Sequence, residues 1–139
     1  MNRLTLVSLS IIFQFTALAA NAQNSPTAAY LELHKKELAA TSYADLLLLR
    51  SASSIAHDKP MSKEDMNFIF PIFKATLPKN ITVINEQVKG TSAILKATAK
   101  PGTTNANTTE TTVGEIELTL ENGQWKIEHE KWDSKIVMK

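Results

Sequence analysis

Apolar residues recur with a helical period in the first half of this chain and with an alternating period in the second half. From Pro26 to about Ala40, apolar and aromatic side chains return every three to four residues among charged ones, which predicts an amphipathic helix. Ser25 is the expected N-cap of this helix, and Pro26 suits its first position. The first half is therefore predicted to be helical.

Two more helices are predicted before the period changes. The second begins at Ser42, where Asp45 follows at the spacing of a capping box, and ends at Asp58-Lys59-Pro60. The third begins at Ser62 and carries apolar residues at helical spacing as far as Leu77. Pro71 lies inside it, so we expect a kink or break near Phe70.

After Pro78 the pattern is that of antiparallel strands. Segments 81–88 and 91–99 are predicted strands joined around Lys89-Gly90, and polar residues 100–112 are predicted to form a long, mobile hairpin loop. Asn122-Gly123 is a preferred two-residue type I′ turn between alternating strands. The chain is therefore predicted to be an α+β protein with three N-terminal helices packed on a four-stranded antiparallel sheet.

The two-residue turn predicts a register for the last hairpin. Regular pairing places Leu120 opposite Trp125, Leu118 opposite Ile127 and Ile116 opposite His129, all on the apolar face. The same register puts four carboxylates on the outer face: Glu115, Glu117, Glu128 and Glu130. Because like charges then oppose one another directly, the register calls for some compensating partner.

The first 22 residues have the pattern of a secretory signal peptide. A basic start at Arg3 precedes an apolar stretch shorter than the ~20 residues that span a bilayer, and small residues follow it. We expect cleavage after Ala22, which leaves a single domain, residues 23–139, in the periplasm or secreted. No membrane insertion is expected after the signal is removed.

Composition excludes several classes of function. The chain has no cysteine, so thiol catalysis and Cys-ligated metals are excluded. The formal net charge is +1, which argues against nucleic acid as a partner. Nucleotide-binding, metalloprotease and serine-hydrolase motifs are absent from the sequence, and no cofactor or metal is expected.

Three residues are candidates for acid–base chemistry. The predicted register places His129 on the apolar face, and His34 lies between Tyr30 and Leu38 on the buried stripe of the first helix. Histidine in an apolar pocket is a plausible general acid or base, and Tyr30 is a further candidate. The alternative is that both histidines are hydrogen-bonded residues at the edge of the core.

The outer face offers a different kind of site. The four carboxylates named above are a solvated face or a surface for docking a basic protein partner. Trp132 falls on the opposite face from Trp125 in a regular strand, so it is exposed as a contact residue unless a bulge turns it inward.

Helices followed by a sheet that ends in Gly-Gln-Trp-Lys-Ile, with Tyr30 in the first helix and Gly-Thr-Ser-Ala at Gly90–Ala93, resemble the nuclear-transport-factor-2-like superfamily. These SnoaL-like or cystatin-like proteins include small exported bacterial proteins of undefined function. The resemblance covers most of residues 26–133 and implies a curved sheet wrapped around a long helix, with a cone-shaped cavity. Some members are isomerases or dehydratases that use Asp, Tyr or His; others bind ligands or dimerise.

The first functional hypothesis is a non-enzymatic periplasmic binding module. Its partner is a small apolar ligand in the cone or a protein on the outer face, and one version is an immunity-type inhibitor of a periplasm-targeted toxin. The alternatives are an isomerase or dehydratase that uses His129 and His34, and a structural module that forms a homodimer.

Overall fold

The computed structural model describes residues 24–100 and 108–138 and has an α+β fold. Four helices come first: α1 (Pro26–Ala39), α2 (Tyr43–Leu47), α3 (Ala52–His57) and α4 (Lys63–Thr76). Four strands follow: β1 (Ile81–Lys89), β2 (Ser92–Ala99), β3 (Thr108–Glu121) and β4 (Gln124–Met138). The predicted signal peptide lies outside the described residues, as do residues 101–107 of the predicted loop. No described helix is long and apolar enough to cross a membrane.

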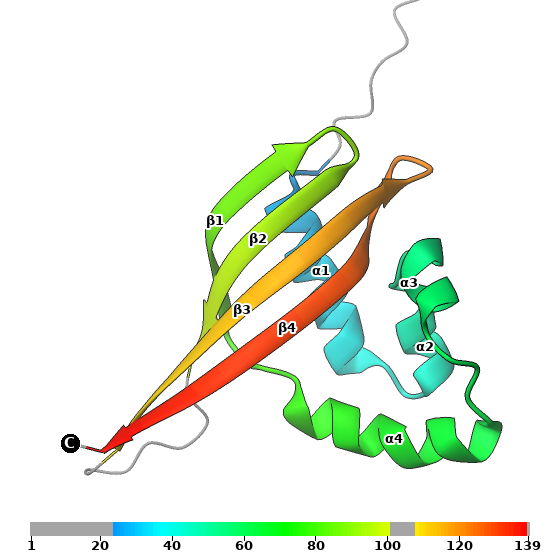
Figure 1. The fold of residues 1–139 in the computed structure, drawn as a ribbon, viewed down its shortest axis with the longest axis horizontal. Helices are drawn as coiled ribbons and strands as arrows, with labels where there is room; N and C mark the ends of the chain where they lie inside the picture. Colours follow the sequence, from blue (N-terminus) through cyan, green and yellow to red (C-terminus); the bar gives the residue numbers. More distant parts are fainter. Residues whose placement is uncertain (1–23, 101–107, 139) are drawn as a thin grey trace, which may run out of the picture.

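The strands form one antiparallel sheet in the order β1-β2-β3-β4, so each strand pairs with its neighbours in sequence. Figure 1 shows α1 lying across one face of this sheet, which we call the inner face, while α2 and α3 lie beside β4. The core fills the space between α1 and the inner face, and consists of Tyr30, Leu33, Leu49, Ala93, Leu95, Ala97, Ile116, Leu118, Trp125 and Ile127.

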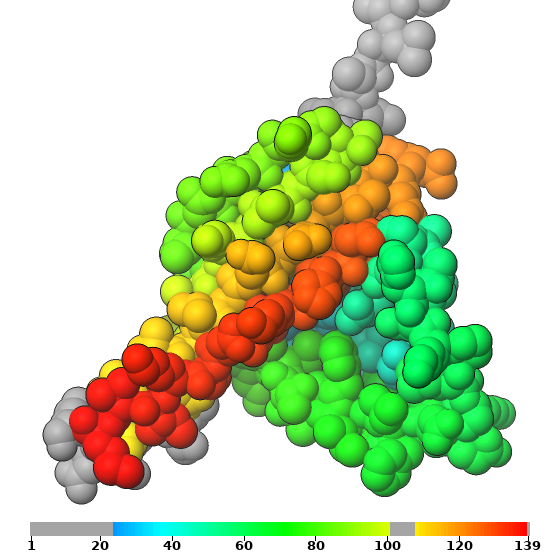
Figure 2. Space-filling view, viewed as in Figure 1, coloured from blue at the N-terminus to red at the C-terminus, as the bar shows by residue number. Residues whose placement is uncertain are grey.

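The other face, the outer face, is open to solvent. Figure 2 views the molecule from this side, and the far ends of β3 and β4 project from the body as a two-stranded ribbon. Residues on the outer face alternate with the buried ones along β2 and β3, as expected for an antiparallel sheet with one wet side.

The helix boundaries follow the predicted caps in most places. The Ser25 side chain accepts a hydrogen bond from the Ala28 N–H at the start of α1, and Ser42 and Asp45 form the predicted capping box of α2. Ser62 caps α4 in the same way. The predicted start residues are therefore confirmed.

The predicted second helix is wrong, because the chain forms two short helices with an interruption between them. At the interruption, the Ser51 N–H donates to the Ile127 carbonyl at 2.9 Å, and the Ile127 N–H donates to the Leu49 carbonyl at 3.0 Å. These bonds join the segment to the edge of β4, and Ser51 then caps α3. Pairing with a distant strand thus replaces the helical bonds that the local pattern predicted.

α4 continues through Pro71, so the break that was one of the two predicted outcomes does not occur. Pro71 removes the hydrogen bond to the carbonyl of Asn67, which is an exposed residue, so water can satisfy that carbonyl. None of the α4 residues is buried. Most of the core therefore lies between the sheet and α1. The structure has four helices where three were predicted, and α4 contributes no buried residue.

Candidate functional site

The chemistry-bearing side chains gather at one end of the inner face, in what we call the polar cluster. α1 contributes Tyr30, His34 and Glu37, which are buried at 0%, 5% and 2% relative exposure. β4 contributes Glu130 and Trp132, which are partly buried. Charged and polar groups at this depth need hydrogen-bond partners, and each of these side chains has at least one.

Glu130 is the acceptor at the centre of the polar cluster. The Tyr30 hydroxyl donates to Glu130 Oε1 at 2.6 Å, and the Trp132 indole N–H donates to the same oxygen at 2.6 Å. Burial and the negative charge of Glu130 raise the pKa of the Tyr30 phenol far above its ordinary value. Tyr30 is therefore a hydrogen-bond donor and not a base near neutral pH.

His34 and Glu37 lie one helical turn apart and form a pair. His34 Nδ1 is 3.1 Å from Glu37 Oε2, and His34 Nε2 is 2.8 Å from the carbonyl oxygen of Pro78. Burial opposes the charge on His34, but hydrogen bonds to Glu37 and Pro78 outweigh it and raise the pKa of His34. Burial raises the pKa of Glu37, and the nearby charge of Glu130 adds to this effect.

A β-bulge at Glu128 decides which β4 residues reach the polar cluster. Leu118 pairs with Ile127 and Leu120 with Trp125, as predicted, but Glu117 pairs with His129 because Glu128 is an extra residue on β4. From there on, every side chain of β4 exchanges faces relative to the regular register. Glu130 and Trp132 consequently turn inward.

The predicted position of His129 on the apolar face is therefore wrong. His129 is exposed and shares the outer face with Glu117, whereas His34 is buried under the inner face as predicted. The sheet separates the two histidines, so they do not form a joint site. Of the three acid–base candidates, the structure brings together His34 and Tyr30, whose rings are 6.0 Å apart.

The predicted block of four outer carboxylates is also wrong. Glu130 lies inside, and Glu115 pairs with Lys131 across the strands, with Lys96 Nζ at 3.9 Å on the other side. Glu117 faces His129. The bulge thus replaces each like-charge pair of the regular register by a pair of opposite or complementary groups, which is more favourable on an antiparallel sheet.

Glu128 has an environment of its own at the bulge. Its Oε2 accepts hydrogen bonds from the hydroxyls of Ser51, Ser53 (2.5 Å) and Thr119 (3.1 Å). The bonds from Ser51 and Ser53 hold the pKa of Glu128 below its ordinary value. Glu128 thereby fixes α3 against the edge of β4, at the point where β4 bulges.

Trp132 takes the second of its two predicted positions, turned inward by a bulge. Its ring lies against Gly114 on β3, where an added Cβ would be 2.6 Å from ring atom Cζ3. Only glycine leaves room for the indole there. Trp132 therefore closes one side of the polar cluster and positions Glu130, and it is not an exposed contact residue.

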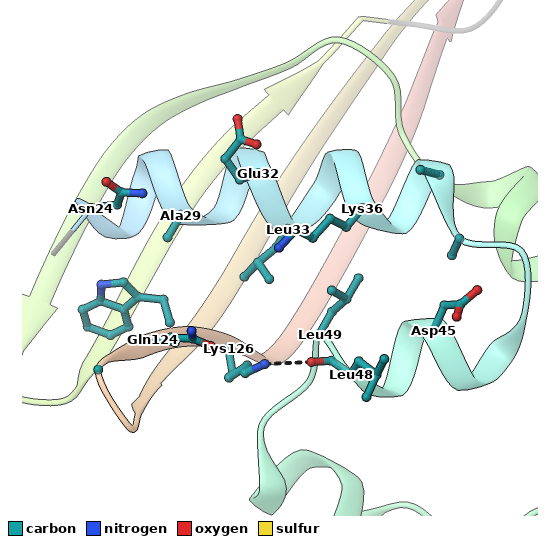
Figure 3. A pocket seen from close by; sticks show the side chains of 14 residues that line it. Asn24, Ala29, Glu32, Leu33, Lys36, Asp45, Leu48, Leu49, Gln124 and Lys126 are labelled. Atoms are coloured by element: carbon teal, nitrogen blue, oxygen red, sulfur yellow. Dashed lines mark hydrogen bonds between the residues drawn. The ribbon is translucent and has the colours of Figure 1, made fainter.

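A separate groove of about 720 Å³ lies between α1, the end of α2 and the β3–β4 turn. Figure 3 shows Leu33 and Leu49 directed into this space, with Leu48 beside them. Leu48 is 71% exposed, so its apolar side chain is available to a ligand in the groove. The remaining lining residues are Asn24, Ala29, Glu32, Lys36, Ala39, Ala40, Asp45, Gly123, Gln124, Trp125 and Lys126.

No protein-family model, curated protein or solved structure matches this chain. The resemblance to the nuclear-transport-factor-2-like superfamily therefore stays a prediction.

Sequence reasoning missed two parts of the site. Glu37 is one of several charged residues in the first helix, and its spacing of three from His34 places both on one helical face. The groove was missed because its walls come from three separate elements. The i, i+3 spacing could have revealed Glu37, whereas no local signal encodes the groove.

Proposed function

We propose that this protein is a non-enzymatic binding module that takes a small anionic amphiphile in the groove between α1, α2 and the β3–β4 turn. The observation that carries the proposal is the combination of an apolar floor with lysines at the rim. Leu33, Leu48 and Leu49 supply apolar surface, and the groove volume of about 720 Å³ is in the range of small-molecule sites. We also propose that the protein acts outside the cytoplasm.

The groove is lined by two carboxylates and two lysines, and the carboxylates are the more heavily engaged within the protein. Glu32 is engaged by Lys35 at 2.5 Å, and Asp45 accepts hydrogen bonds from Thr41 and Ser42. Both carboxylates are therefore occupied by groups of the protein itself.

The ammonium groups at the rim have donors to spare. Lys126 Nζ donates one hydrogen bond to the Leu48 carbonyl at 2.8 Å (Figure 3), so it retains two further N–H groups. Lys36 is exposed and also lines the groove. A carboxylate or phosphate head can pair with these lysines while its apolar chain covers Leu48 and Leu33.

The other functional hypotheses have less support. An isomerase or dehydratase that pairs His129 with His34 needs both on one side of the sheet, and they lie on opposite faces. A toxin inhibitor that docks a basic protein on Glu115, Glu117, Glu128 and Glu130 needs these carboxylates on one surface. Glu130 lies on the inner face and Glu128 is hydrogen-bonded to Ser51 and Ser53, so only Glu115 and Glu117 share the open outer face. A small-ligand site does not depend on either arrangement.

The proposal is tested by isothermal titration with three probes of equal chain length, each kept below its micelle concentration. Dodecanoate should bind at one site, whereas dodecyltrimethylammonium and dodecyl maltoside should bind weakly or not at all. Lys36→Glu should weaken dodecanoate binding roughly tenfold, which corresponds to about 1.4 kcal/mol. Leu48→Asp should abolish it, and since Leu48 is exposed this change should leave the fold intact.

Lys63→Glu is the matched control, because Lys63 is an exposed lysine on α4 that does not line the groove. It should leave dodecanoate binding unchanged. Equal binding of all three probes would refute the anionic preference. No binding of dodecanoate, or equal losses in the Lys63 and Lys36 variants, would refute the site.

A further inference from the structure

His34, Glu37 and Glu130 place three metal-binding atoms together in the polar cluster. One ring nitrogen and one oxygen from each carboxylate all lie within 4.8 Å of one another. A metal ion with bonds of about 2.1 Å needs its ligand atoms about 3.4 Å apart in a tetrahedral site, so small side-chain rotations suffice. Two of the ligands are on one turn of α1, and the third is on β4, so the site joins the helix to the sheet.

The orientation of His34 is that of a metal ligand. Its Nε2 lies 2.8 Å from the Pro78 carbonyl oxygen, which has no hydrogen to donate, so Nε2 carries the N–H. In the neutral ring Nδ1 then has a lone pair, and this lone pair points toward Glu37 Oε2 at 3.1 Å. Histidine ligands in metal sites are usually held in this way, with the second ring nitrogen donating to a backbone carbonyl.

Two acceptors that face each other at 3.1 Å require a cation between them. A proton fills this place in the hydrogen-bonded pair, and a metal ion can take the same place. Glu130 supplies the next ligand: both of its hydrogen bonds, from Tyr30 and Trp132, converge on Oε1, so Oε2 is left for an ion as far as the described residues are concerned.

The lysine and arginine nearest the polar cluster do not pair with its carboxylates. Arg50 acts on Glu37 from a distance, and Lys74 Nζ binds the backbone carbonyls of Glu37 and Leu38 at the end of α1, not the carboxylate. Two partly or fully buried carboxylates thus share the site without a direct salt bridge to lysine or arginine among the described residues. A divalent ion would neutralise both.

We propose that His34, Glu37 and Glu130 bind one divalent transition-metal ion, with Zn²⁺ the best match. One imidazole and two carboxylates are ligands that Zn²⁺ accepts, and with three protein ligands a fourth position remains for water. The Tyr30 hydroxyl and the Trp132 N–H orient the Glu130 carboxylate from outside the ligand set.

A cavity of about 650 Å³ lies next to this site, although none of the three ligands lines it. Its lining includes Pro78 and Trp132, which are the hydrogen-bond partners of His34 and Glu130, together with Leu77, Thr112 and Ser134. The metal site and the proposed ligand groove share no lining residue, so each can be tested without the other.

The experiment titrates chelator-treated protein, free of any polyhistidine tag, with ZnCl₂ in a calorimeter and with CoCl₂ in a spectrophotometer. One Zn²⁺ should bind per chain, Co²⁺ should develop the visible absorption of a low-coordinate site, and Zn²⁺ should raise the unfolding temperature. His34→Gln should weaken Zn²⁺ binding at least tenfold. Glu130→Gln should do the same while keeping an acceptor for Tyr30 and Trp132, so its fold is expected to survive.

The two other histidines provide matched controls. His57→Gln and His129→Gln remove exposed imidazoles, and both should bind Zn²⁺ as the unmodified protein does. Circular dichroism of the metal-free variants identifies any that fail to fold, and Glu130→Gln then decides the result. Absence of Zn²⁺ binding, or binding that is lost in the His57 or His129 variant and retained in the Glu130 variant, would overturn the proposal.

Discussion

The two ends of the inner sheet face are built from the same strands but have opposite character. At the end near the β3–β4 turn, Leu118 and Ile127 are at most 1% exposed and pack among apolar neighbours. At the other end, α1 and β4 present the polar cluster, in which Glu130 takes the inward position. The change occurs within a few residues of β4.

The bulge at Glu128 separates the two ends. Before it, β4 follows the alternation that the turn predicts; after it, the faces are exchanged. An uninterrupted strand would have put His129 inside and Glu130 in solvent. One extra residue therefore converts a plain hydrophobic face into a buried polar site, and the predictions below test this difference.

The largest effect is expected from moving the register of β4 beyond the bulge. Deletion of Lys131 should expel Trp132 from the inner face and cost about 3–5 kcal/mol, as for removal of a packed tryptophan. Deletion of Glu128 removes the extra residue itself and leaves the later residues on their observed faces. It should cost only about 1–3 kcal/mol, from the lost bonds to Ser51, Ser53 and Thr119.

Urea unfolding followed by circular dichroism measures both deletions. If the strand had no bulge, deletion of Glu128 would exchange the faces of all later residues and would cost as much as deletion of Lys131. Equal losses of stability for the two deletions would therefore contradict the bulge at Glu128, and with it the difference between the two ends of the inner face.

A smaller effect is expected at Gly114, beyond the bulge. Gly114→Ala places a methyl group 2.6 Å from a Trp132 ring atom and should cost about 1–3 kcal/mol through overpacking. In a Trp132→Leu background the same change should cost much less, so the two substitutions should be coupled in a double-mutant cycle. If the free-energy costs of the two substitutions are additive, the Trp132 indole does not contact Gly114.

The smallest effect is the pH dependence of the bond network at Glu128. Because hydrogen bonds lower the pKa of Glu128 in the folded state, its stabilising contribution is present above its ordinary pKa of 4.5 and is lost as pH falls through the folded value. The stability difference between the unmodified protein and Glu128→Gln should therefore shrink between pH 6 and pH 3. Ser53→Ala should remove part of this dependence, and a difference that grows on acidification would contradict it.

The sequence predicted the order of helix and strand and the paired ends of the last hairpin, because these follow from local chemistry. Ser25, Ser42 and Ser62 mark helix starts, and Asn122-Gly123 sets the register as far as Ile127. These signals act over a few residues, so they survive in the fold.

The rest depends on contacts between distant segments. The break before α3 arises from hydrogen bonds between Ser51 and Ile127, and the bulge is held by bonds between α3 and Glu128. No residue type at position 128 marks a bulge. The opposed carboxylates of the regular register were an indirect sign, because that register called for a compensating partner.

The inward position of Glu130 can be measured directly, because the chain contains no cysteine and a single introduced thiol reports its own exposure. Three variants, His129→Cys, Glu130→Cys and Lys131→Cys, are labelled with an aromatic disulfide reagent under native conditions. The bulge predicts fast, slow and fast labelling at these positions. Slow, fast and slow labelling would show that β4 has the regular register, and would contradict the origin of the polar cluster.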